Sequence, residues 1–112
     1  MEYGYNYLKD LKDKLNTHMF KYEDSDGYPY TLIEEHVVTK LFDELYHKVE
    51  NEKQYYGLSD YNLYCMQRLL TELLLCLRDI LHYRSYNERL YSNVIESKVV
   101  NNELDKLISL YK

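Results

Sequence analysis

The residues of this chain that are best suited to chemistry are carboxylates and histidines, and few of them stand at a productive spacing. Glu44 and His47 lie three residues apart in a segment that we expect to be helical, so both would lie on one helix face. A metal centre inside a helical bundle needs this pair on two helices, with further inward glutamates on the other two. A second Glu-x-x-His does not occur in the sequence. We therefore interpret the pair as part of a solvated face and expect no metal.

The acidic segment Asp24-Ser25-Asp26-Gly27 shares one feature with calcium-binding loops, in which Asp or Asn alternates and then meets glycine. If Gly27 takes the sixth position of such a loop, Tyr22 takes the first and Ile33 stands where the bidentate glutamate belongs. Both positions need oxygen ligands that these side chains do not supply. The segment therefore predicts a turn.

Arg78 and His82 lie four residues apart near the end of the third expected helix. In this respect the chain resembles some helical-bundle ribonucleases, the HEPN class, in which an arginine is followed after a longer interval by a histidine. Only three residues separate Arg78 from His82, and Arg84 has no histidine after it. Because the spacing departs from the ribonuclease pattern, we carry no activity over. Cations that stabilise a helix C-terminus explain the pair more simply.

Other catalytic arrangements are not apparent. No serine, cysteine or lysine can be matched with a supporting base, and the three glycines are too scattered for a phosphate-binding loop. We expect no enzymatic activity and no cofactor. Cys65 and Cys76 lie eleven residues apart on one expected helix, a rise of about 16 Å, so they cannot form a disulfide with each other. Reduced, buried thiols in a cytoplasmic protein are the simplest interpretation.

Tyrosines interleaved with arginines form the segment that most strongly suggests binding. Tyrosine and arginine are enriched at protein interfaces and lysine is depleted, and this chain has no lysine between Lys53 and Lys98. Arginines and tyrosines can also bind the phosphates of a nucleic acid and stack on its bases. A third interpretation is that these side chains only cover the edge of the core. We expect a protein-binding surface made of Tyr83, Arg84, Tyr86, Arg89 and Tyr91, with Tyr55, Tyr56, Tyr28 and Tyr30 as secondary contacts.

The composition is unusual. The 112 residues include fifteen tyrosines and no alanine, and residues with AT-rich codons predominate. This bias indicates an AT-rich genome, such as that of a low-GC bacterium, its phages and plasmids, or a large DNA virus. The net charge of −5 argues against general binding to a phosphate backbone. An acidic face over residues 23–52 could instead imitate DNA, although Lys40 and Lys48 interrupt it and Lys53 follows it.

Four helical segments must position these residues. Leucines at a three-four spacing predict a helix over 5–19. Thr31 and Glu34 fit a capping box that starts a second helix, ending near Gly57. The third, from Ser59 or Asp60 to about residue 83, is apolar nearly all round and is therefore expected at the centre or in a dimer seam. A fourth runs from residue 85 or 87 to 111, with a break expected near 101–102.

These segments predict one all-α domain over residues 1–112, a compact bundle of four or five helices with the third at its centre. For residues 19–33 a simple loop is favoured over a short β-hairpin. The longest apolar run, Leu73 to Leu77, is too short for a membrane span, and no secretory signal opens the sequence. We expect the protein in the cytoplasm, that of a host cell if a phage or virus encodes it.

The expected function is therefore that of a small non-enzymatic interaction module. It would be an inhibitor or adaptor, encoded by a phage or another mobile element, that binds and occludes a host protein. One alternative is a nucleic-acid-linked regulator that binds through the arginines or mimics DNA through the acids. A second alternative is a structural subunit whose exposed rings form a homodimer seam on the third helix.

Overall fold

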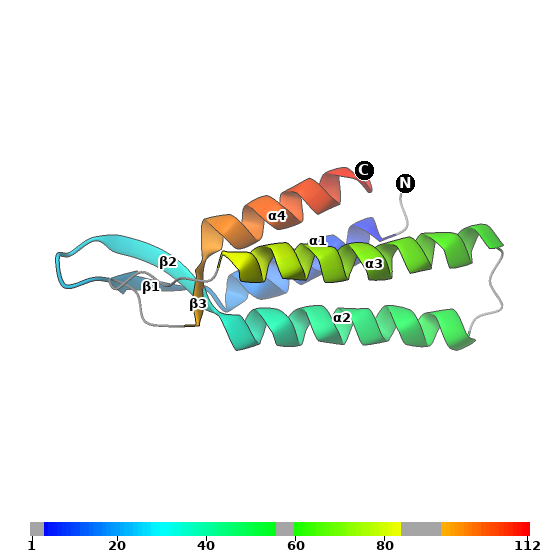
Figure 1. Cartoon of the computed structure of the whole chain (residues 1–112), viewed down its shortest axis with the longest axis horizontal. Coiled ribbons are helices and arrows are strands. Elements are labelled where there is room, and N and C mark those ends of the chain that lie inside the picture. The colour runs from blue at the N-terminus through cyan, green and yellow to red at the C-terminus, as the bar shows by residue number, and fades with distance from the viewer. Residues whose placement is uncertain (1–3, 56–59, 84–92) are drawn as a thin grey trace.

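The computed structural model describes residues 4–55, 60–83 and 93–112. These residues form an elongated bundle of helices with a small sheet at one end, and the chain measures 56 Å along its longest axis (Figure 1). The elements in chain order are α1 (Tyr5–Thr17), β1 (Phe20–Glu23), β2 (Pro29–Glu34), α2 (Glu35–Tyr55), α3 (Asp60–His82), β3 (Val94–Glu96) and α4 (Ser97–Ser109).

The four helices pack around one core. α2 and α4 each pack against both α1 and α3, so that α1 and α3 lie at diagonal corners. Each helix turns a stripe of apolar residues at a three-four spacing inward. Buried residues of these stripes include Leu8 and Leu15 of α1, Phe42 and Val49 of α2, Leu69, Leu73 and Ile80 of α3, and Leu104 of α4. The expected helical bundle is confirmed in this coarse form, but α3 is a corner helix with one exposed face, not a central helix.

Residues 20–34 form a β-hairpin, and the predicted loop is wrong. β1 and β2 pair antiparallel, with Phe20 opposite Leu32 and Tyr22 opposite Tyr30. At the tip the Asp24 N–H donates to the Tyr28 carbonyl, and Gly27 adopts a left-handed conformation with φ 79°. A three-residue loop ending in such a glycine matches the right-handed twist of the strands. The alternation of aromatic and charged residues on β1 was the valid signal.

A third strand corrects the predicted start of the last helix. Val94 and Ile95 lie in β3, which pairs antiparallel with β2, and α4 begins only at Ser97. Both side chains are buried, and β-branched residues pack well on a pleated surface. The sheet has the order β1-β2-β3, so it is more than the short hairpin considered from the sequence.

The predicted capping box is also wrong. Thr31 lies within β2, and α2 begins at Glu35. The Glu35 N–H donates to the carbonyl of Asn93, at 2.8 Å. Because a residue beside β3 satisfies this backbone donor at the helix start, the helix begins where the sheet ends.

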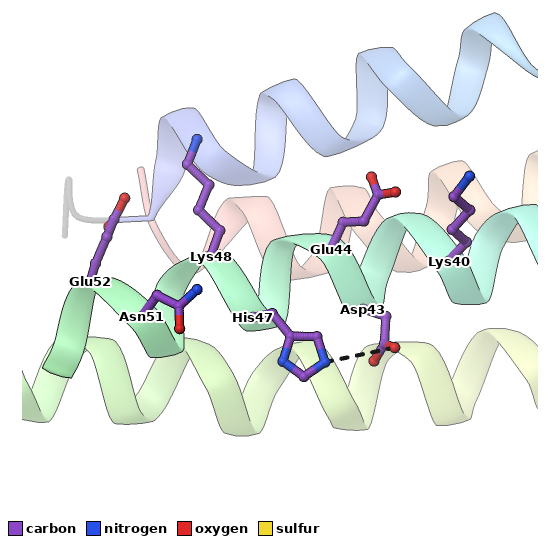
Figure 2. A pocket seen from close by; sticks show the side chains of 7 residues that line it. All are labelled: Lys40, Asp43, Glu44, His47, Lys48, Asn51 and Glu52. Carbon is purple, nitrogen blue, oxygen red and sulfur yellow. Dashed lines mark ion pairs between the residues drawn. The ribbon is translucent and has the colours of Figure 1, made fainter.

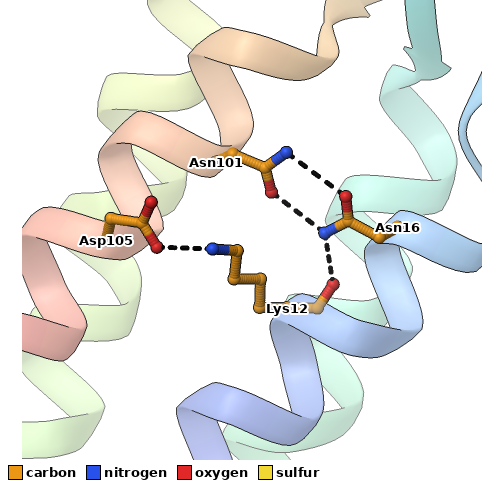
Figure 3. A network of polar contacts seen from close by, with 4 residues as sticks. All are labelled: Lys12, Asn16, Asn101 and Asp105. Atoms are coloured by element: carbon orange, nitrogen blue, oxygen red, sulfur yellow. Dashed lines mark hydrogen bonds and ion pairs between the residues drawn. The ribbon is translucent and has the colours of Figure 1, made fainter.

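α4 continues through residues 101–102, where a break was expected. Figure 3 shows a set of polar contacts between α4 and α1 at this point. Asn16 and Asn101 exchange side-chain hydrogen bonds of 2.9 and 3.2 Å, and Lys12 pairs with Asp105 at 2.7 Å. Asn101 therefore faces α1 as a helical residue.

Within the described ranges, no helix combines the length and apolar character needed to cross a membrane.

Candidate protein-interaction site

Glu44 and His47 do not converge on a common ligand position. Figure 2 shows the Glu44 side chain directed towards α1 and the His47 ring directed away from it. His47 lies 3.9 Å from the Asp43 carboxylate, an exposed pair one helical turn apart. Together with Lys40, Lys48, Asn51 and Glu52 they line an open depression along α2. No group of three potential metal ligands occurs among the described residues. The interpretation as a solvated face agrees with this geometry.

Asp24 belongs to the hairpin turn. Its Oδ1 accepts hydrogen bonds from the backbone N–H groups of Asp26, at 2.9 Å, and Tyr28, at 2.8 Å. The Asp24 carboxylate is buried, whereas Asp26 is exposed. The predicted turn is confirmed. The Asp24 carboxylate stabilises it by accepting hydrogen bonds from the backbone of the turn.

Arg78 and His82 make separate contacts. The Arg78 Nη2 lies 3.4 Å from the Asp79 carboxylate, and the His82 ring meets the Tyr83 ring edge-on at 5.5 Å between centroids. Neither contact joins the arginine to the histidine. The geometry thus offers no support for a shared catalytic role.

The two cysteines are free and buried on the inner side of α3, as the sequence suggested. Burial raises the pKa of the Cys76 thiol to about 12, with a smaller contribution from Glu103 and other nearby carboxylates. The thiol therefore stays protonated at neutral pH. A protonated, buried thiol is a poor nucleophile, and Cys76 serves as an apolar core residue.

The hairpin tip presents an aromatic side chain on a fixed backbone. Tyr28 is 57% exposed, and its ring lies 5.1 Å from that of Tyr30, tilted by 49°. Tyr30 is half-buried and packs with Leu32 and Val94 on one side of the sheet. Two contacts therefore fix the position of Tyr28. Asp24 binds its backbone N–H in the turn, and Tyr30 of the sheet packs against its ring.

The structure divides the predicted contact residues between two ends of the molecule. Tyr83, 55% exposed, follows α3 at the sheet end, where the hairpin with Tyr28 and Tyr30 also lies (Figure 1). Tyr55 ends α2 at the opposite end, about 35 Å away by the length of α3. Arg84, Tyr86, Arg89, Tyr91 and Tyr56 lie outside the described residues.

The sequence analysis considered exposed rings on the third helix as one alternative, but it did not name the apolar residues that are exposed on the bundle. These are Tyr61, Tyr64, Leu74 and Leu75 on α3 and Leu110 after α4. The signal was present, because α3 is apolar nearly all round. Periodicity alone could not say which of its faces would stay uncovered.

The chain matches no protein-family model, no curated protein and no solved structure. Its own residues therefore supply every basis for a functional proposal.

Proposed function

We propose that this protein is a small non-enzymatic interaction module that binds and occludes a partner protein at its sheet end. It would serve as an inhibitor or adaptor, of the kind that phages and other mobile elements encode. The observation that carries this proposal is the exposed ring of Tyr28 on the hairpin tip, in tilted contact with the ring of Tyr30. Tyr83 adds a second exposed ring at the same end of the bundle.

A supported tyrosine is a favourable anchor for protein binding. It offers a large contact area at a low cost in side-chain entropy, and a preorganised loop loses little further freedom on binding. The six residues of β2 span about 20 Å, so the tip stands well beyond the bundle (Figure 1). A projecting tip suits insertion into a cleft on the partner.

The charges of the hairpin favour a protein over a nucleic acid. Lys21 is the one cation of residues 20–34, and it lies among Glu23, Asp24, Asp26 and Glu34. An acidic hairpin repels a phosphate backbone, whereas a tyrosine anchor with an acidic rim suits a protein surface that carries cations. Binding of this kind should therefore survive nuclease treatment.

The proposal is tested by affinity capture from a nuclease-treated lysate of the organism that encodes the chain. We compare the unaltered protein with Tyr28→Ser and with Tyr64→Ser, which removes a similarly exposed ring from α3. A partner that the Tyr64→Ser variant retains, and that the Tyr28→Ser variant binds about tenfold or more weakly, supports the proposal. Equal capture by all three proteins, or capture that disappears with nuclease, contradicts it.

A further inference from the structure

One residue, Asp24, takes part in every printed hydrogen bond that fixes the backbone of the hairpin turn. Its backbone N–H donates to the Tyr28 carbonyl at 3.1 Å, and its carbonyl accepts from the Gly27 N–H at 2.9 Å. Its side-chain Oδ1 accepts from the N–H groups of Asp26, at 2.9 Å, and Tyr28, at 2.8 Å. Both backbone polar groups of Tyr28 are therefore bonded to Asp24.

The Asp24 carboxylate takes the place of a backbone acceptor in the strand ladder. Two facing residues of a regular hydrogen-bonded antiparallel pair exchange two backbone bonds. Asp24 faces Tyr28, because the adjacent residues Glu23 and Pro29 are paired across the strands. The bond from Asp24 to Tyr28 is of the backbone kind, but the return bond from the Tyr28 N–H ends on the carboxylate. Pro29 follows directly and has no N–H to donate, so this acceptor fixes the start of the return strand.

The Asp24 side chain lies inside the turn and not on its surface. Asp24 is 7% exposed, although residues 25–29 are all exposed. A buried carboxylate is costly unless hydrogen bonds satisfy it, and hydrogen bonds to a charged acceptor are stronger than neutral ones. Because Asp24 offers a partner little surface of its own, its effect on binding must pass through the shape of the turn.

We propose that Asp24 is the positioning residue of the hairpin tip, and that its carboxylate holds the Tyr28 ring in the orientation in which the partner protein binds it. This inference rests on the proposed function and adds how the site is kept ready. With the Tyr28 backbone fixed by Asp24, the ring lies 5.1 Å from that of Tyr30. Without the carboxylate the tip samples other turns, and the affinity falls in proportion to the fraction of molecules that keep the binding shape.

Loss of a positioning residue changes a different rate constant from loss of the anchor. The partner associates only with molecules in the binding shape, so loss of the Asp24 carboxylate lowers the association rate constant. The complex that then forms has all its contacts, and its dissociation rate constant changes little. Loss of the Tyr28 ring removes a contact, and most changes of that kind raise the dissociation rate constant.

Three variants separate the hydrogen bonds of Asp24 from its charge. Asp24→Ala removes the side-chain acceptor, whereas Asp24→Asn keeps an oxygen that can accept the same two bonds. Asp26→Ala is the matched control, because it removes the same charge from the same turn. It leaves Asp24 in place and keeps the backbone N–H of residue 26.

Amide hydrogen exchange tests the positioning without any partner. The Tyr28 N–H should exchange about tenfold or more faster in Asp24→Ala, because it loses a hydrogen bond to a charged acceptor. Asp24→Asn and Asp26→Ala should stay close to the unaltered protein. The Leu32 N–H, further along β2, shows whether the hairpin stays paired. If Asp24→Ala opens the whole hairpin, both amides exchange faster, and reversal by Asp24→Asn still assigns the effect to the hydrogen bonds.

Two results of this measurement would overturn the proposal. One is unchanged exchange at the Tyr28 N–H in Asp24→Ala. The other is an equal acceleration in Asp24→Asn or in Asp26→Ala, because the charge of the turn and not the acceptor would then be the cause.

Surface plasmon resonance tests the consequence for binding, with the purified protein that the unaltered chain captures as the probe. Asp24→Ala should lower the association rate constant by about tenfold and leave the dissociation rate constant nearly unchanged. Asp26→Ala should associate nearly as fast as the unaltered protein. A loss of affinity that lies wholly in dissociation, or equal slowing by Asp26→Ala, overturns the proposal. If Tyr28→Ser binds as well as the unaltered protein, the proposed function is wrong, and the exchange measurement still decides whether Asp24 fixes the tip.

Discussion

α2 and α3 are neighbouring helices of similar length in the same bundle, yet their outer faces differ completely. The outer face of α2 carries Lys40, Asp43, Glu44, His47 and Lys48, side chains that water solvates well (Figure 2). The outer face of α3 carries exposed tyrosine, leucine and arginine instead. Both helices bury an apolar stripe of the same kind on their inner side.

The difference shows that the needs of the fold do not explain the surface of α3. A corner helix in this bundle requires an apolar stripe facing the core, and α2 meets that requirement with a charged outer face. The additional leucines of α3 expose apolar surface to water, which offers no gain in the free energy of folding. Their placement is explained if another protein surface covers them.

Adjacent leucines on α3 provide the sharpest form of this comparison. Leu73 is buried and Leu74 is exposed, so the same change to alanine separates core from surface. Leu73→Ala should lower the free energy of unfolding by about 2–5 kcal/mol through lost burial and a residual cavity. Leu74→Ala should change it by less than about 0.5 kcal/mol when measured in urea at low protein concentration. Similar losses for both variants would show that Leu74 belongs to the core.

High pH should lower the free energy of unfolding through two buried groups, Cys76 of α3 and Tyr111. Burial raises the pKa of Cys76 and of Tyr111 to about 12, above their ordinary values of 9.0 and 10.0. Below the ordinary values both groups are protonated in the folded and the unfolded chain, so their stabilising contribution is complete. As pH rises from 9 to 12, the unfolded chain releases these protons first and the contribution is lost.

We therefore expect the free energy of unfolding to fall across this range, as measured by urea titrations at each pH. Tyr111→Phe should reduce the fall between pH 10 and 12. The hydroxyl of Tyr111 is buried without a hydrogen-bond partner, so this variant should be as stable as the unaltered protein at pH 7. An alkaline decline of the same size in the phenylalanine variant would show that the tyrosine is not its cause.

Substitutions on the outer face of α2 should have the smallest effect on the free energy of unfolding. The His47–Asp43 pair is exposed on both sides, and such pairs contribute little to stability. His47→Ala should change the free energy of unfolding by less than about 0.5 kcal/mol, as measured in urea. A larger loss would show that the outer face of α2 contributes to the fold and would remove the contrast between the two helices.

The sequence predicts the inner faces of the helices well, because a three-four spacing of leucines is a local property. β3 could not be found in this way, since Val94 and Ile95 fit a helix as well as a strand. What decides their structure is pairing with Glu34 and Ile33, about sixty residues earlier in the chain. The hairpin was underrated for a related reason, since its turn residues are equally typical of a loop.

The candidate site could be predicted only in part. Tyrosines could be singled out by their frequency, and Tyr28 and Tyr83 are indeed exposed. The exposure of Leu74 and Leu75 depends on how α3 is oriented between α2 and α4, which its apolar pattern leaves undetermined. The separation of Tyr55 from Tyr28 likewise follows from the antiparallel course of α2 and α3 and not from any local pattern (Figure 1).

The affinity of the captured partner for the Tyr28→Ser variant tests the account most directly. Titration calorimetry compares this variant with the unaltered protein and with Tyr64→Ser, which removes an exposed ring from α3. The account predicts a dissociation constant that is about tenfold or more higher for Tyr28→Ser and unchanged for Tyr64→Ser. Equal constants for all three proteins would contradict the assignment of the binding site to the hairpin tip.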